Sequence, residues 1–330
     1  MEPYFSEQPN SRQIKRMDEK NQPSAIRHYR NLTKTIVQQY FGKPASRISY
    51  KPTGLTNYVF TVNHVEGQFV IRISPDAERI NAFKKELWTS QKAREAGVPT
   101  PEVLAVGNDA VSEPYMITRR VTGTEGTHHP TRIRIVQEMG EYAAIINSIP
   151  TTGFGINFDW TNAEQNYTTW ESYLEKEFGL DARLQLFSTN KLLTDGQLKE
   201  LVNIITGARA TQHKTALNHG DLRLKNVIVD EGGDIAAIVD WEDCLSTIAP
   251  EWELSVALHD LTIDEKHAFI EGYGLSVEQV EEMAPLIKAF NILNYSQAIE
   301  RAIDTEDEKS LDEIKLRLNG ALDLYSLGCG

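Results

Sequence analysis

The sequence contains few cysteines and no long apolar run. Its 330 residues include only two cysteines, Cys244 and Cys329, which are too few for a disulfide framework and have no metal-ligand spacing. No apolar stretch approaches the roughly 20 residues that a membrane-spanning helix needs. The first eight residues lack the charged start and apolar middle of a signal peptide. We therefore expect a cytoplasmic protein without a membrane segment.

Basic residues are also scarce. The chain has 34 Lys and Arg against 47 Asp and Glu, a formal net charge of −13. Sequence-independent binding to nucleic acid depends on cations that neutralise phosphates, so this balance argues against a nucleic-acid partner. It suits a cationic partner, although many cytosolic enzymes are acidic simply because net charge keeps them soluble. Walker A and G-x-G-x-x-G sequences are absent, which leaves the P-loop and Rossmann classes without their motifs.

The length of the chain predicts two lobes, because single hydrophobic cores stop growing at roughly 250–300 residues. Residues 1–23 are polar and are expected to form a loose tail. Residues 24–118 have mainly β-like patterns, and residues 119–330 have mainly helical ones. This order predicts an α+β protein with a small β-rich N-terminal lobe and a larger helical C-terminal lobe.

Helices are predicted where apolar residues recur at helical spacing. The first begins with Ser24 as its N-cap and ends near Tyr40, and the others cover 76–96, 131–149, 168–186, 194–211, 250–260, 264–273, 277–303 and 307–326. Strands are predicted at 57–62, 68–73, 103–106 and 115–118.

The most informative segment is residues 219–226, which read His-Gly-Asp-Leu-Arg-Leu-Lys-Asn. Asp240 follows Asn226 by fourteen positions, and between them two apolar runs flank the turn sequence Asp-Glu-Gly-Gly-Asp, which predicts a hairpin. Folding the strands back about Gly233 brings the Asn226 amide opposite the Asp240 carboxylate. Such a pair, completed by substrate phosphates, suits Mg²⁺. Asp221, just upstream, is then placed to act as a base.

The pattern H-x-D-x-x-x-x-N, followed by a hairpin and an Asp, resembles the catalytic and metal-binding segments of kinases. The spelling His-Gly-Asp, with Asp-Trp-Glu after the hairpin, is similar to the aminoglycoside phosphotransferase and choline kinase superfamily, which has a protein-kinase-like fold. The resemblance implies that Asp221 is the catalytic base, that Asn226 and Asp240 hold Mg²⁺ and that His219 braces the loop. Lys225 is either a cation near the γ-phosphate of ATP or GTP, or a solvent-facing side chain.

A second segment of the resemblance concerns the nucleotide phosphates. Thr53-Gly-Leu-Thr-Asn57 resembles the superfamily's nucleotide-positioning loop, although Thr53 stands where that loop often has a first glycine. Gly54 lets the backbone approach an anion, and Thr56 and Asn57 add hydrogen-bond donors.

The strand that follows this loop supplies a cation. Strand alternation puts Val70 and Arg72 on one face. The resemblance gives Arg72 a contact with the phosphates, and Glu86 on the next helix is the expected ion-pair partner. An exposed arginine and a solvated glutamate are the alternative.

The segment from Tyr115 to Gly123 resembles the linker between the two lobes of the superfamily. The resemblance implies that the backbone from Arg119 to Val121 contacts the adenine ring and that Met116 packs near it.

These features predict an ATP- and Mg²⁺-dependent phosphotransferase that acts on a hydroxyl group of a small molecule. The resemblance implies an aminoglycoside, amino sugar or amino alcohol as acceptor. The acidic segment after the hairpin either suits a cationic acceptor or is a solvated face without a role in binding. Glu242, Glu251 and Glu253 are the candidate acceptor contacts, and Glu253 alternatively buttresses the catalytic loop. A protein kinase and a catalytically silent nucleotide-binding scaffold are the alternatives. The pattern leaves the acceptor and the oligomeric state open.

Overall fold

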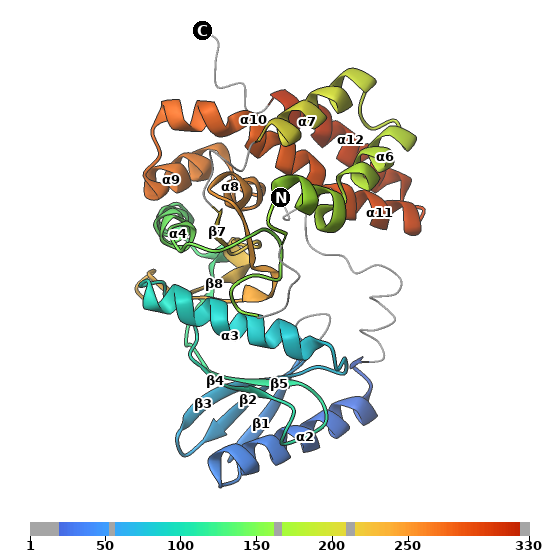
Figure 1. Cartoon of the computed structure of the whole chain (residues 1–330). Coiled ribbons are helices and arrows are strands. Elements are labelled where there is room, and N and C mark those ends of the chain that lie inside the picture. Colours follow the sequence, from blue (N-terminus) through green and yellow to red (C-terminus); the bar gives the residue numbers. More distant parts are fainter. Residues whose placement is uncertain (1–19, 53–56, 162–166, 209–214, 324–330) are drawn as a thin grey trace. The chain divides into compact units, whose positions relative to one another are not determined.

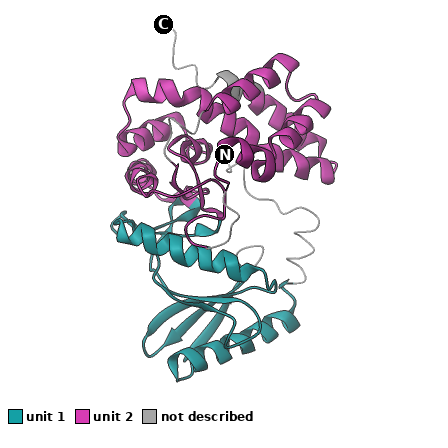
Figure 2. Cartoon of the chain, viewed as in Figure 1, with its two compact units in different colours: residues 1–126, 225–242 teal, residues 127–224, 243–330 magenta. Residues whose placement is uncertain are grey.

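The computed structural model describes residues 20–52, 57–161, 167–208 and 215–323. The chain divides into two compact units, which Figure 2 colours separately. Unit 1 comprises residues 1–126 and 225–242, and unit 2 comprises residues 127–224 and 243–330. This differs from the linear division expected after residue 118, because the hairpin that follows the catalytic motif pairs with a strand at 124–125.

Unit 1 contains a five-stranded antiparallel sheet in the order β1-β2-β3-β5-β4 (Figure 1). Its strands are β1 (Arg47–Lys51), β2 (Tyr58–His64), β3 (Gly67–Ile73), β4 (Val103–Gly107) and β5 (Tyr115–Arg119). Side chains of β2 and β3 alternate between buried and less buried, the period of two that predicted these strands. The register places Arg72 of β3 opposite Met116 of β5.

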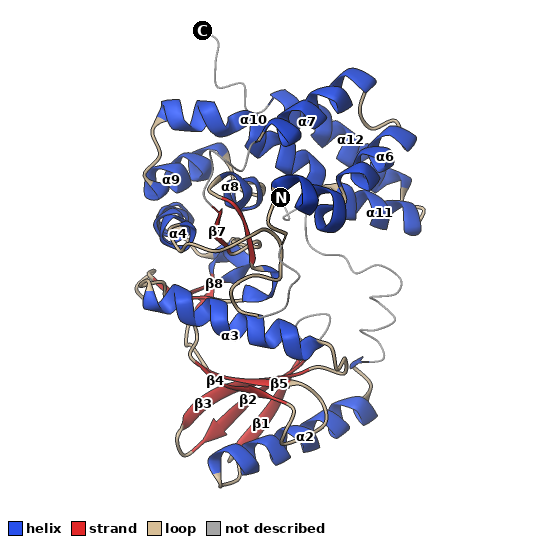
Figure 3. Cartoon of the chain, in the orientation of Figure 1, coloured by secondary structure: helices blue, strands red, loops and turns tan. Residues whose placement is uncertain are grey.

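Two helices cover opposite faces of this sheet (Figure 3): α2 (Pro23–Phe41) and α3 (Arg79–Glu95). Ile36 of α2 belongs to one core cluster with Phe69 and Ile71 of β3. The other face carries Arg72, whose guanidinium carbon lies 5.5 Å from the centre of the Phe83 ring of α3. The alternation of β3 thus separates an apolar core from a charged face.

The start of α2 differs from the prediction. The helix begins at Pro23 with Gln22 as its N-cap, and no side chain caps it. The assignment of Ser24 as the cap was therefore wrong. Proline suits the first helical position, because its missing N–H would have no partner there.

The hairpin predicted after the catalytic motif is present. Its strands β8 (Val227–Val229) and β9 (Ile235–Ile238) form a three-stranded sheet with β6 (Thr124–Glu125), in the order β6-β8-β9. The Ile238 N–H donates a hydrogen bond to the Pro99 carbonyl at 2.8 Å. The hairpin therefore contacts the rest of unit 1 at two places, β6 and Pro99.

Unit 2 is mainly helical, and its described part also has an antiparallel strand pair, β7 (Thr215–Asn218) with β10 (Leu245–Ile248). Its helices are α4 (Arg132–Asn147), α5 (Trp170–Tyr173), α6 (Leu180–Thr189), α7 (Asp195–Gly207), α8 (Glu251–Ala257), α9 (Ile263–Tyr273), α10 (Val277–Asn294), α11 (Ser296–Asp304) and α12 (Glu308–Asp323).

Two predicted helices of unit 2 are interrupted. Gly179, with a φ of +66°, separates the segment that begins with α5 from α6. The helix predicted at 277–303 divides at Tyr295 into α10 and α11. Both interruptions fall inside long periodic segments, where spacing alone predicts one continuous helix. Among the described residues, no helix is long and apolar enough to cross a membrane.

Candidate active site

Asn226 and Asp240 lie at the same end of the β8–β9 hairpin. The Val239 N–H donates to the Asn226 carbonyl oxygen at 2.9 Å, next to the paired residues Val227 and Ile238. Asp240 has a φ of +67°. This left-handed conformation costs a residue with a Cβ about 1–2 kcal/mol. Such backbone strain is concentrated at functional sites, where the surrounding structure maintains it.

The hairpin end offers one amide oxygen and one carboxylate to a metal ion. Asn226 is buried and Asp240 is half-buried. The described ranges contain no group of three or more His, Cys, Asp or Glu that could hold a metal ion. Mg²⁺ needs no such group, because it is usually bound by one or two carboxylates together with substrate phosphates and water. The donors at the hairpin end therefore fit Mg²⁺ that arrives with a nucleotide.

Arg72 of β3 and Glu86 of α3 form the ion pair expected from the sequence. Both side chains are largely buried, with exposed fractions of 17% and 7%. The Arg72 Nη2 also contacts the Met116 sulfur at 2.9 Å. Burial raises the pKa of Glu86 against the opposing effect of Arg72. The pair is thus desolvated, and removing either partner would leave a buried charge.

Asp240 and Glu242 act electrostatically on both Arg72 and Glu86. Within unit 1, the expected phosphate-binding cation Arg72 and the expected metal ligand Asp240 are therefore close enough to interact electrostatically. Glu242, which was expected to contact the acceptor, lies 3.3 Å from Arg79 at the start of α3. This ion pair links the segment after the hairpin to the helix that carries Glu86.

The expected nucleotide contacts on β2 and β3 are only partly described. Gly54 and Thr56 lie outside the described residues. Asn57, which follows them, is buried, and its Oδ1 has no hydrogen-bond partner among the described residues. Val70 is half-buried, and Met116 is fully buried.

The backbone donors expected to contact adenine are engaged within the sheet. The Arg119 N–H donates to the Glu102 carbonyl at 2.8 Å, and the Arg120 N–H donates to the Gln68 carbonyl at 2.9 Å. Strand pairing thus uses these two N–H groups, and the expected contact of adenine with the backbone from Arg119 to Val121 stays a prediction. Val121, the last residue of that segment, is half-buried.

The catalytic loop begins directly after β7 in unit 2. His219 and Asp221 are both buried, and the Asp221 N–H donates to His219 Nδ1 at 3.3 Å. Between them, Gly220 has a φ of +79°, and a Cβ at this position would lie 2.3 Å from the Asp243 carbonyl oxygen. Only glycine fits, which explains the middle residue of His-Gly-Asp.

Glu253 of α8 is fully buried against this loop. Its Oε2 accepts the His219 N–H at 2.5 Å, and backbone hydrogen bonds from Gly220 and Leu222 also favour its charged form. Burial outweighs them and raises the pKa of Glu253 to about 7. These contacts match the buttressing alternative for Glu253 and leave it no exposed surface for an acceptor.

The acidic residues expected to attract a cationic acceptor mostly lie inside unit 2 or have partners there. Glu251 is only 2% exposed. Glu265 forms an ion pair with Arg132 at 2.7 Å. Asp260 lies 3.8 Å from Arg223. Several carboxylates of the acidic segment thus have a basic partner or are buried within unit 2.

Arg223 is the residue of this loop that the sequence analysis overlooked. Its Nε and Nη2 both contact Asp221 Oδ1, and its Nη1 lies 3.8 Å from Asp260 Oδ2. Lys225, the cation selected from the sequence, is half-buried in the 3-10 turn Leu224–Asn226. The sequence signal for Arg223 was only a cation two positions after the expected base.

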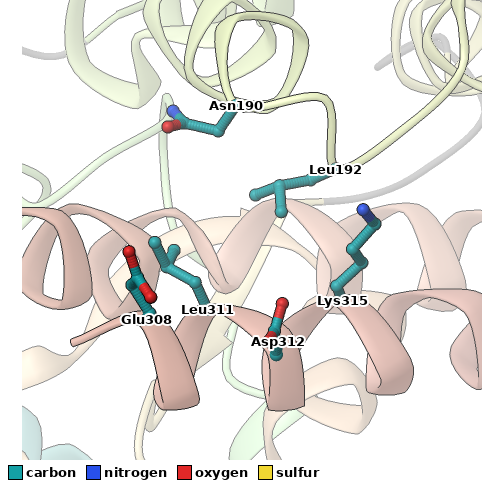
Figure 4. Close-up of a pocket in the computed structure, with 6 residues that line it drawn as sticks. All are labelled: Asn190, Leu192, Glu308, Leu311, Asp312 and Lys315. Carbon is teal, nitrogen blue, oxygen red and sulfur yellow. The ribbon is translucent and has the colours of Figure 1, made fainter.

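A pocket elsewhere in unit 2 contains none of the predicted site residues. It lies between α12 and the segment after α6, and Figure 4 shows its lining residues Asn190, Leu192, Glu308, Leu311, Asp312 and Lys315. None of them belongs to the catalytic loop or to the elements that contact it. The pocket is therefore not part of the candidate active site.

A sequence model described as the phosphotransferase enzyme family matches residues 51–286. The chain belongs to this family. The matched range includes the Arg72–Glu86 pair, the loop that contains Asp221 and the hairpin.

The chain is similar to the hygromycin-B 4-O-kinase of Escherichia coli. That enzyme is 26% identical to this chain over 184 residues. These residues are 54% of this chain and 52% of that enzyme, so the chain spans about half the length of this relative.

Solved structures show the same fold over most of this chain. A thermostable mutant of aminoglycoside phosphotransferase APH(4)-Ia, in ternary complex with AMP-PNP and hygromycin B, superposes with a TM-score of 0.63 and 17% identity. The superposition covers 90% of this chain and 99% of the other. For a putative fructosamine-3-kinase from Haemophilus somnus 129PT the TM-score is 0.58, with 15% identity and 88% and 96% coverage. The α+β, kinase-like fold predicted from the sequence is thereby confirmed.

Proposed function

We propose that this protein is a small-molecule kinase that transfers the γ-phosphoryl group of ATP to a hydroxyl group. The proposal rests on the loop that contains Asp221, whose N–H donates a hydrogen bond to His219 Nδ1. Asn226, the first residue proposed to bind metal, follows Asp221 by five residues. Phosphoryl transfer needs mainly in-line positioning and charge neutralisation. The chain offers a base, a pair of metal donors and a buried cation for these tasks.

Each residue then has a separate task. Asp221 accepts the proton of the acceptor hydroxyl while the hydroxyl oxygen bonds to the γ-phosphorus and the bond to the ADP oxygen breaks. Asn226 and Asp240 hold Mg²⁺, which neutralises phosphate charge when it is bound. Arg72 binds the phosphates and is held by Glu86.

The remaining nucleotide contacts are assigned by position. Gly54, Thr56 and Asn57 donate hydrogen bonds to the phosphates, and Val70 and Met116 contribute to the adenine site. Lys225 is a second cation for the γ-phosphate. ATP is supported by relatives solved with AMP-PNP or ADP, and GTP stays an alternative because aminoglycoside phosphotransferase APH(2")-IIia was solved with GDP and kanamycin.

We assign the acceptor to the class of amine-bearing sugars and amino alcohols. The relatives named for hygromycin B, kanamycin and fructosamine support this class, as does the net charge of −13. Long-range attraction between an acidic protein and a cationic acceptor weakens as salt screens it. The KM of the best acceptor should therefore rise with ionic strength.

The test measures ADP release with ATP and a panel of hydroxylated amines and neutral sugars, followed by mass spectrometry of the product. Asp221→Asn should lower kcat by about 10²–10⁴, the usual effect of losing a positioned general base. Glu231→Gln, which changes an exposed carboxylate at the turn of the hairpin, is the matched control. Binding of ATP without turnover of any acceptor would favour the silent scaffold instead.

The metal assignment has a separate test. Asp240→Asn should abolish Mg²⁺-dependent binding of ATP in calorimetry, since it removes the carboxylate of the donor pair. Unchanged affinity for MgATP in this variant would contradict the metal site at the hairpin end, whatever the acceptor is.

A further inference from the structure

We propose that Arg223 is a positioning residue that orients the carboxylate of Asp221, and that Asp260 is its anchor. This inference rests on the proposed function, because it takes Asp221 to be the base. It gives the catalytic loop a second cation besides Lys225, one that acts on the base and not on the γ-phosphate.

The contacts of Arg223 with Asp221 are made to one oxygen. Nε and Nη2 both approach Asp221 Oδ1. Two nitrogens of a planar guanidinium on a single carboxylate oxygen restrict the position of that oxygen and hence the conformations open to the side chain. The direction of the other oxygen, Oδ2, is then restricted as well. Catalysis by a general base depends on such a direction, because the proton moves only along a short, aligned contact.

Asp260 forms an ion pair with the remaining nitrogen of the guanidinium. Arg223 Nη1 lies 3.8 Å from Asp260 Oδ2, and the two side chains are 20% and 23% exposed. Asp260 stands in the segment between α8 and α9, where it also lies 4.0 Å from His259 Nε2. Asp260 thereby connects Arg223 to the segment that follows α8. Glu253 of α8 supports the same loop by accepting the main-chain N–H of His219.

This arrangement distinguishes Arg223 from a phosphate-binding arginine. All three of its guanidinium nitrogens face carboxylates. Arg72, in contrast, directs its Nη2 to one carboxylate, that of Glu86, and to the Met116 sulfur. An arginine between two carboxylates serves their placement, so its loss should affect turnover rather than nucleotide affinity.

The kinetic test compares Arg223→Ala, Arg223→Lys and Asp260→Asn. Misplacing a catalytic group by about 1 Å can cost about 10²-fold, so Arg223→Ala should lower kcat by about 10–100-fold and change the KM for ATP less than about 2-fold. Arg223→Lys should recover part of the loss, since an ammonium supplies the charge without the planar fork. Asp260→Asn should lower kcat by a smaller factor.

The double variant Arg223→Ala/Asp260→Asn should be no slower than Arg223→Ala alone, because without the arginine Asp260 has no link to Asp221. Arg134→Ala, which removes an exposed arginine from α4, is the control and should leave kcat unchanged. Multiplicative effects of the two changes, or a raised KM for ATP with kcat intact in Arg223→Ala, would overturn the positioning role.

A measurement without turnover separates this inference from the proposed function. In ¹⁵N-labelled protein the Arg223 Nε–H should exchange slowly with water, because Asp221 accepts its hydrogen bond. Exchange should become faster in Asp221→Asn and in Asp260→Asn, and stay slow in Arg134→Ala. Fast exchange of this proton in the wild-type protein would show that Arg223 does not hold Asp221 in place. A slow Nε–H in a protein that phosphorylates nothing would contradict the kinase proposal and leave the contact intact.

Discussion

The main-chain N–H of His219 donates to the carboxylate of Glu253 at 2.5 Å, so a residue of α8 holds the first residue of the catalytic loop. The other carboxylate oxygen, Glu253 Oε1, is buried without a hydrogen-bond partner among the described residues. A proton on this oxygen would relieve the burial of negative charge. The raised pKa of Glu253, about 7, agrees with such a partly protonated state.

Glu253 should make the free energy of unfolding decrease as pH rises. Its pKa is about 7 in the folded protein and 4.5 in the unfolded reference, so between these values the folded state keeps a proton that the unfolded state has lost. The stabilisation is complete below pH 4.5 and is lost as pH rises through 7, and it amounts to about 3 kcal/mol. Glu253→Gln should remove this decrease, because glutamine keeps one oxygen for the His219 N–H and does not titrate. Urea unfolding between pH 4.5 and 7.5 measures it.

His259 should contribute the opposite dependence. Burial lowers its pKa from 6.5 to about 4 against the attraction of Asp260, and the Asn291 amide nitrogen lies 2.8 Å from its Nδ1. The folded state therefore lacks a proton that the unfolded state binds below pH 6.5. The stability that His259 contributes is present above pH 6.5 and is lost as pH falls through 4. His259→Asn, which preserves an acceptor for Asn291, should remove this loss in the same urea experiment.

The two effects overlap between pH 4.5 and 6.5, where they have opposite signs. In that range the free energy of unfolding of Glu253→Gln, plotted against pH, should have a slope more positive than that of wild type by about 1.4 kcal/mol per pH unit. The slope of His259→Asn should be more negative than that of wild type by the same amount. The double variant should return to the wild-type slope. Equal slopes in all four proteins would show that neither group has the shifted pKa.

Two glycines allow α4 and α9 to approach each other closely. A Cβ on Gly140 would lie 2.1 Å from the Phe269 carbonyl oxygen, and a Cβ on Gly272 would lie 1.9 Å from the Gln137 carbonyl oxygen. Gly140→Ala and Gly272→Ala should each destabilise the protein by about 1–3 kcal/mol, because the backbones must separate. Chemical denaturation gives the change in free energy of unfolding.

Gly207 at the end of α7 is the matched control for these glycine variants, since a Cβ there meets no atom within 4 Å. Gly207→Ala should be neutral or stabilising by up to about 1 kcal/mol. If Gly140→Ala were as stable as Gly207→Ala, the close contact between the two helices would be incorrect.

The parts of the site that could be predicted from the sequence depend on local order. The spacing of Asn226 and Asp240 about a turn predicts where both residues lie, because a hairpin is set by its own residues. The Arg72–Glu86 pair follows from strand alternation and from the cost of an unpaired buried charge. Neither inference needs knowledge of distant segments.

The parts that could not be predicted depend on contacts between distant segments. β7 and β10 pair across about 30 residues and are short and mostly buried, so they show no alternation. The contact of Arg223 with Asp260 joins a loop to a segment 37 residues away. The acidic residues after the hairpin look like one charged face, but their partners Arg79, Arg132 and Arg223 come from three different segments.

The Arg72–Glu86 pair should contribute to both the stability of the protein and its affinity for ATP, and its two side chains should show non-additive effects on stability. Arg72→Met and Glu86→Leu each leave one buried charge without its partner, so each should destabilise the protein by about 3–5 kcal/mol, while the double variant should cost less than their sum by about 1–3 kcal/mol. Affinity for ATP should be lost in Arg72→Met and in the double variant, because both lack the cation proposed to bind the phosphates. Glu86→Leu should retain weakened binding, since Arg72 remains but loses its partner. Calorimetric titration with ATP and urea unfolding of the four proteins complete the cycle. Additive free energies of unfolding would mean that the two side chains do not interact, and unchanged ATP affinity in Arg72→Met would exclude this arginine from the nucleotide site.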